Sequence, residues 1–138
     1  MSRLLRCSLC LFVGLAWTLS LTAAHADDGR LFELRTYITN DGKLPELHKR
    51  FRDHTTKLFE KHGMTIIGFW TPVDGPEAEN TLVYMLAYPD MDARKESWAG
   101  FIADPDWTAV YKASRANGPL VKKVISQFVG PTDYSPIK

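Results

Sequence analysis

The chain has 138 residues, a formal net charge of +1 and 45% apolar residues, enough for one domain with one hydrophobic core. Lys122 and Lys123 make a pair rather than a basic patch, which argues against a nucleic-acid partner. No internal repeat, low-complexity tract or long linker is visible, so neither a repeat array nor a multidomain chain is indicated.

The first 26 residues have the pattern of a secretory signal peptide. Arg3 and Arg6 precede an apolar run over 7–24, and the segment closes with the small-residue exit Ala24-His25-Ala26. The run is shorter than the ~20 residues that a membrane-spanning helix needs. We therefore predict cleavage near Ala26, a periplasmic or secreted location, and no stable membrane anchor afterwards.

The predicted mature domain covers residues 27–138, which is 112 residues. Its formal charge changes from +1 to −1, because Arg3 and Arg6 are lost. Both cysteines, Cys7 and Cys10, lie in the leader. The mature chain therefore has no disulfide, thiolate metal ligand or cysteine nucleophile.

Residues 31–38 predict a strand, because Phe32, Leu34 and Ile38 alternate with more polar side chains. Residues 44–62 predict a helix, with a proline in the first turn and Gly63 as a left-handed stop. The helix has one apolar stripe at helical spacing, made of Leu44, Leu47, Phe51, Thr55 and Leu58.

Residues 64–71 and 81–88 predict two strands that form a hairpin across the loop 72–80. Asp90 can cap a helix over 91–103, and Asp104 followed by Pro105 restarts a helix that ends at 117–119. Residues 122–129 predict the last strand, and 131–138 form a tail. The side chains expected to face the core from these two helices are Trp98, Phe101, Ile102, Trp107, Val110 and Tyr111.

The resulting order is βαββαβ, an α+β ferredoxin-like unit whose second helix is split in two. Helices on one face of a four-stranded sheet leave the other face bare, and a chain of this size needs a partner there. Five aromatic residues are too many for one side of a thin sandwich: Phe69, Trp70, Tyr84, Tyr88 and Phe128. We expect a twofold homodimer, that is, a dimeric α/β barrel.

Several blocks resemble the NIPSNAP family. They are Phe32-Glu33-Leu34-Arg35-Thr36-Tyr37, the segments 51–55 and 58–64, Ser97-Trp98 with 103–107, and the tail 133–138. The resemblance covers residues 31–138 and implies a dimeric α/β barrel fold. It implies no particular reaction, because the family has none that is generally established. Relatives by fold include cofactor-independent monooxygenases and haem-handling enzymes, and fold alone does not fix function.

Glu33, Arg35 and Tyr37 share one strand face. If the apolar face of this strand meets the helices, these three residues face the barrel interior between two copies. Arg35 would then be a fork donor and Tyr37 a hydrogen-bond donor to an anion or a carbonyl group. The alternative is a structural Glu33–Arg35 ion pair at the dimer interface.

His54 is a candidate general acid or base at a pocket mouth, with Tyr37 as the other candidate proton handler. His54 and His62 are eight residues apart, which is not metal-ligand spacing, so we predict no metal and no cofactor. Trp70 and Tyr84 are candidate walls of an apolar ligand pocket, although the sequence does not settle which sheet face they occupy.

Three functions remain open. The first is a homodimeric module that binds a small apolar or aromatic ligand. The second is an enzyme of the cofactor-independent oxygenase or isomerase type, and the third is a purely structural or interaction dimer. A cavity would favour the first two, and an acid or base within reach of that cavity would favour the second.

Overall fold

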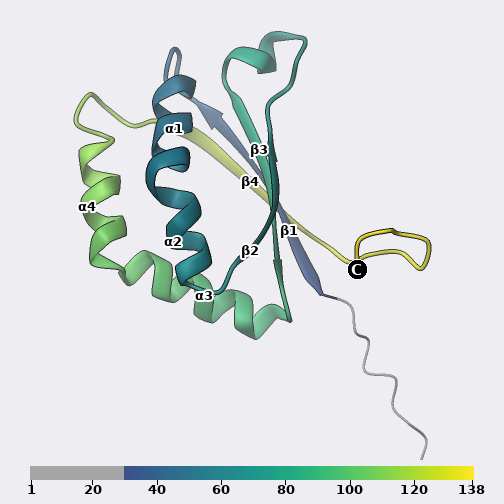
Figure 1. Cartoon of the computed structure of the whole chain (residues 1–138). Coiled ribbons are helices and arrows are strands. Elements are labelled where there is room, and N and C mark those ends of the chain that lie inside the picture. Colours follow the sequence, from purple (N-terminus) through teal and green to yellow (C-terminus); the bar gives the residue numbers. More distant parts are fainter. Residues whose placement is uncertain (1–29) are drawn as a thin grey trace, which may run out of the picture.

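The structure is a computed structural model that describes residues 30–138. The predicted signal peptide, residues 1–26, lies outside the described residues. Four antiparallel strands, β1 (Leu31–Thr39), β2 (Thr65–Trp70), β3 (Thr81–Tyr88) and β4 (Val121–Val129), form one sheet in the order β2-β3-β1-β4. The helices all lie on one side of this sheet (Figure 1). Within residues 30–138 no helix has the length and apolar character needed to cross a membrane.

The second helical region is divided as predicted. Helix α3 (Met91–Ala103) ends at Asp104, and α4 (Pro105–Ala113) begins directly after it. The Asp90 side chain accepts hydrogen bonds from the first backbone N–H groups of α3, and Asp104 accepts one from the N–H of Asp106. These caps satisfy N–H groups that have no partner inside the helix. The ferredoxin-like α+β fold with a split second helix is therefore confirmed.

The predicted helix over 44–62 forms in three consecutive parts. Helix α1 (Leu44–Arg50) continues into a π-helical segment η1 (Phe51–Thr55) and then into α2 (Thr56–Lys61). All five residues of the predicted stripe are buried, and Gly63 has the expected positive φ of 75°. The π-helical turn is a departure from the prediction, because it widens the helix where the stripe crosses the sheet.

The expected orientation of β1 is wrong. Glu33, Arg35 and Tyr37 point towards the helices, not into a space between two sheets, because Glu33 accepts hydrogen bonds from Arg94 and Trp98 of α3. The physical reason is that α3 supplies polar donors to this face. A charged strand face can therefore be buried under the helices once its charges are paired.

The apolar face of β1 is the one that the helices leave uncovered. Strand register places on it Leu34 and Ile38 of β1, Val83 and Met85 of β3, Trp70 of β2, and Ile125 and Val129 of β4. We call these seven residues the open face. The C-terminal tail lies on this side of the sheet (Figure 1), and its Pro131 and Ile137 line a hollow together with Phe32.

The loop between β2 and β3 contains a short 3₁₀ helix, η2 (Pro76–Glu79). Gly68 of β2 makes room for the Trp70 ring, since a Cβ at Gly68 would lie 2.7 Å from that ring. The indole of Trp70 therefore lies across its own strand on the open face, and it is 51% exposed. Tyr84, by contrast, is fully buried on the helix side of β3.

Candidate functional site

The carboxylate of Glu33 is the centre of a buried hydrogen-bond network. Glu33 is fully buried, and both of its oxygens are occupied. Arg35 Nη1 lies 2.5 Å from Oε1, and Arg94 binds both oxygens through Nη2 at 2.8 Å and Nε at 3.0 Å. Its side-chain donors are Arg35, Tyr88, Arg94, Trp98 and Ser126.

This network holds Glu33 ionised. Burial raises the pKa of Glu33, but hydrogen bonds from Arg94 and Ser126 and the charge of Arg35 outweigh it and lower that pKa to about 2. A carboxylate with so low a pKa and no free oxygen is a poor proton acceptor. Glu33 therefore has a structural role, as an anchor that fixes β1, α3 and β4 to one another.

Arg35 connects the network to the aromatic core. Its Nε donates to the Tyr84 hydroxyl at 2.9 Å and its Nη2 donates to the Tyr37 hydroxyl at 3.3 Å. The guanidinium also lies 4.3 Å from the centre of the Trp98 ring. Arg35 has one charge partner, Glu33, and three aromatic neighbours inside the protein. These contacts occupy its guanidinium and argue against the predicted role of Arg35 as a donor to a bound anion.

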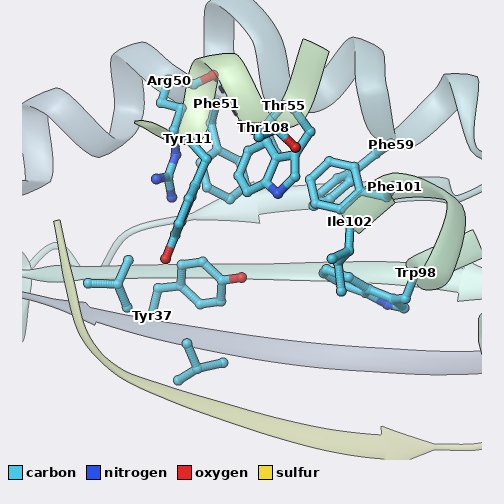
Figure 2. A pocket seen from close by; sticks show the side chains of 13 residues that line it. Tyr37, Arg50, Phe51, Thr55, Phe59, Trp98, Phe101, Ile102, Thr108 and Tyr111 are labelled. Carbon is cyan, nitrogen blue, oxygen red and sulfur yellow. Dashed lines mark hydrogen bonds between the residues drawn. The ribbon is translucent and has the colours of Figure 1, made fainter. Parts of the chain in front are cut away.

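A cavity of about 430 Å³ lies between the sheet and the helices, next to this network. Figure 2 shows Tyr37 on its floor, Trp98 at one end, and Arg50 and Tyr111 at the other. The walls are mainly aromatic and aliphatic, which is typical of sites for small molecules. The lining residues are Tyr37, Arg50, Phe51, Thr55, Phe59, Trp98, Phe101, Ile102, Trp107, Thr108, Tyr111, Val121 and Val124.

Arg50 is the charged residue in this lining, and it is only 5% exposed. Its Nη1 donates a long hydrogen bond of 3.3 Å to Ser114, and its Nε has no hydrogen-bond partner within residues 30–138. The guanidinium packs 5.3 Å from the Trp107 ring centre and 5.6 Å from that of Tyr111. Burial lowers the pKa of Arg50, since the charged form is desolvated.

The π-helical segment helps to place Arg50 at the cavity. Thr55 is buried, and its hydroxyl donates to the carbonyl oxygen of Arg50 at 3.2 Å. Helical turns of this kind are rare and occur frequently at functional sites. Here the turn brings both Arg50 and Thr55 into the cavity wall.

The structure brings only part of the predicted site together. Tyr37 lines the cavity, and Tyr84 lies beneath it and touches Tyr37, with ring centres 5.2 Å apart. Trp70 lies on the open face, on the other side of the sheet. His54 is exposed and lies along an outer groove between α1, η1 and α4, and it is not part of the cavity wall.

The other histidine considered, His62, has a local structural role. Its Nε2 lies 2.7 Å from Asp104 Oδ2, and Lys61 binds the same carboxylate at 2.8 Å. Gly100 permits this contact, because a Cβ there would lie 2.9 Å from the His62 ring. Across residues 30–138, no group of three or more His, Asp and Glu side chains is placed to hold a metal ion.

Sequence reasoning missed Arg50 as a site residue. The available signal was its position, because Arg50 follows Leu47 by three residues and precedes Phe51, so it borders the apolar stripe of its helix. A long basic side chain next to such a stripe usually reaches solvent. Only the packing of α4 against α1 shows that the side chain of Arg50 is buried.

The fold and the cavity define a ferredoxin-like α+β unit with a pocket between sheet and helices, the unit of the dimeric α/β barrel fold class. The sequence profile of the NIPSNAP family matches residues 32–136, and the chain belongs to this family. A comparison with curated proteins gives no match.

Solved structures agree with this assignment. A NIPSNAP family protein of unknown function from Agrobacterium tumefaciens is similar at 24% identity and a TM-score of 0.71, over 83% of this chain and 98% of that one. An uncharacterised NIPSNAP domain protein from Burkholderia xenovorans is similar at 28% identity and a TM-score of 0.66, over 77% and 98%. SnoaB, a cofactor-independent oxygenase from Streptomyces nogalater, is similar at 15% identity and a TM-score of 0.53, over 78% and 98%, a likeness of fold alone.

Proposed function

We propose that the protein binds a small, largely apolar or aromatic molecule in the cavity between sheet and helices. The observation that carries this proposal is the cavity itself, about 430 Å³ of space walled mainly by aromatic rings. The cavity is open to solvent along one side, where Ile102, Tyr111 and Val124 are exposed, so a small molecule can enter it. A purely structural unit would instead be filled by its own side chains.

We further propose that the protein acts as an exported homodimer, joined through the open face. This surface carries seven apolar residues in strand register, among them Trp70 and Ile125, which are 51% and 37% exposed in the single chain. A patch of this kind on a small domain favours a protein partner, and a second copy related by a twofold axis is the commonest one. The N-terminal pattern of residues 1–26 supports export.

An enzyme of the cofactor-independent oxygenase or isomerase type is the second candidate. Of the two proton handlers that the sequence suggests, Tyr37 lines the cavity and His54 does not. The test requires the ligand recovered from the protein. Its consumption or isomerisation by the wild-type protein, lost in Tyr37→Phe while binding persists, would support an enzyme, whereas unchanged ligand would favour simple binding.

Native mass spectrometry of the protein expressed from the full chain and purified from the periplasm tests the first proposal. We expect twice the mass of residues 27–138 together with a retained small molecule. Val124→Trp places an indole in the cavity from β4 and is expected to abolish the retained mass. Val73→Trp, on a loop where Val73 is 96% exposed, serves as the control.

Two results would contradict this proposal. Retention that is equal in the Val124→Trp variant and in the wild type would place the ligand elsewhere. A ligand-free dimer would favour the structural alternative. A stable monomer would remove the homodimer but leave the cavity, because its thirteen lining residues all come from one chain.

A further inference from the structure

We infer that the ligand is an anion, most simply an aromatic carboxylate, whose charge is held by the guanidinium of Arg50. This inference rests on the proposed function, since it concerns the same cavity. It goes further by naming the chemical class of the ligand and the side chain that selects it.

The charge of Arg50 is unpaired within the described part of the protein. A buried guanidinium is normally paired with a carboxylate or fully hydrogen-bonded, because desolvation of an ion is costly. Within residues 30–138, no acidic side chain lies within salt-bridge distance of Arg50, and its Nε is without a partner. A charge kept inside the protein at this cost needs a compensating group, and the cavity is where that group can be.

Two other arginines on the helix side of the sheet differ from Arg50 in their charge partners. Arg35 and Arg94 also lie between the sheet and the helices, and both are bound to the carboxylate of Glu33. The chain therefore pairs these two partly buried arginines with an acid. Arg50 differs in having the cavity beside it instead of a carboxylate.

A second cation lies at the Arg50 end of the cavity. Arg115 lies 4.8 Å from the ring centre of Tyr111, and the guanidinium of Arg50 lies 5.6 Å from the same ring centre. Within the described residues neither of these two arginines is in a salt bridge, so together they give this end of the cavity a positive potential. An anionic group is attracted there, whereas a cationic group is repelled.

The aromatic walls decide what carries the anionic group. Trp107 packs on Phe101 with ring centres 4.4 Å apart, and Trp98 closes the other end of the cavity. These rings suit a flat apolar skeleton of one or two rings. A carboxylate on such a skeleton would lie at the Arg50 end, with its rings between Tyr37 and the two tryptophans.

The test compares two probes of the same shape, 2-naphthoate and the neutral 2-naphthylmethanol, by isothermal titration calorimetry at pH 7 and 0.15 M salt. We expect the wild-type protein to bind the naphthoate at least about tenfold more tightly. In Arg50→Met the preference should fall to about onefold, because the naphthoate loses its charge partner and the alcohol has no charge partner to lose. Arg52→Met, which removes an exposed arginine two residues away, should keep the preference.

The possible results separate the two proposals. Equal binding of both probes by the wild-type protein would overturn the anion and leave a small-molecule cavity. A preference that survives in Arg50→Met would overturn the role of Arg50. Binding of neither probe would overturn the proposed function and this inference with it. The wild-type comparison needs no variant, so it holds even if a substitution fails to fold.

A second measurement addresses Arg50 without any ligand. Removal of an unpaired buried charge should raise the thermal unfolding midpoint of ligand-free Arg50→Met above that of the wild type. An unchanged or lower midpoint would contradict the inference, because it would show that the Ser114 hydrogen bond and the contacts with the Trp107 and Tyr111 rings already outweigh the cost of burying this charge.

Discussion

Glu33 and Arg50 are both buried charges on the helix side of the sheet, and they differ in how many hydrogen bonds they form. Glu33 accepts hydrogen bonds from five side chains, and these fix its ionised form. Arg50 forms one long hydrogen bond, to Ser114, and lines the cavity. The hydrogen bonds around Glu33 stabilise the protein. The unpaired charge of Arg50 beside the cavity is instead the arrangement expected of a binding site for an anion.

Glu33→Gln is expected to destabilise the protein by about 3–5 kcal/mol at pH 7, because it leaves Arg35 and Arg94 buried without their shared counter-charge. Urea unfolding followed by circular dichroism measures this loss. The matched control is Glu60→Gln, which neutralises an exposed carboxylate outside the network. A loss no larger than that of the control would contradict the structural role of Glu33.

The pH dependence of stability gives a second check on Glu33. Folding lowers its pKa from 4.5 to about 2, so the unfolded state binds more protons in this window and stability rises with pH. This contribution is about 3 kcal/mol above pH 5 and is lost as the pH falls towards 2. The free energy of unfolding of the wild-type protein should rise with pH between about pH 2 and pH 5, and that of Glu33→Gln should lack this rise. The same pH dependence in both proteins would contradict the lowered pKa of Glu33.

Among the helices, the π-helical turn η1 departs from regular α-helical geometry. It lies where α1 passes over the sheet, and the hydroxyl of Thr55 binds the carbonyl oxygen of Arg50 across it. The extra residue lets the helix keep Phe51 and Thr55 in the core while Arg50 points into the cavity. The π-helical turn therefore helps to position Arg50 at the cavity.

Thr55→Val keeps the shape of this buried side chain but removes its hydrogen bond. We expect a loss of about 1 kcal/mol in the free energy of unfolding, measured from the urea midpoint. The control is Thr56→Val, at the neighbouring position, which is less buried. If both variants were equally stable, the Thr55 hydroxyl would have no role in holding the turn.

At the scale of the whole molecule, the sheet has two different faces. The helix side contains the ionic network, the cavity and most of the core, whereas the open face is apolar and almost without charge. An apolar sheet face on a domain of this size favours association. The cavity and the open face therefore lie on opposite sides of the sheet.

Ile125→Asp tests the open face, because Ile125 is 37% exposed in the single chain, and we expect the single chain to fold with an aspartate there. By symmetry each dimer would bury two carboxylates, so the dissociation constant should rise at least about tenfold. Analytical ultracentrifugation measures this change. Val73→Asp adds the same charge on a loop and should leave the dimer intact; dissociation in both variants, or in neither, would place the interface elsewhere.

Local patterns in the sequence determined most of the elements. The alternation in 31–38, the aspartate caps at Asp90 and Asp104 and the stop at Gly63 depend on interactions within a few residues, and their positions were predicted closely. The predicted stripe of the first helix was also confirmed, since helical periodicity fixes which residues share a face.

The sequence by itself therefore determined the βαββαβ order and the family, because both follow from short-range pattern and from matched blocks along the chain. It did not determine which face of β1 lies under the helices, since period-two alternation is the same in either orientation. Only the tertiary structure decided this, because Arg94 and Trp98 of α3 are the groups that make burial of Glu33 favourable. The unpaired state of Arg50 was decided in the same way, by which residues pack around it and which do not.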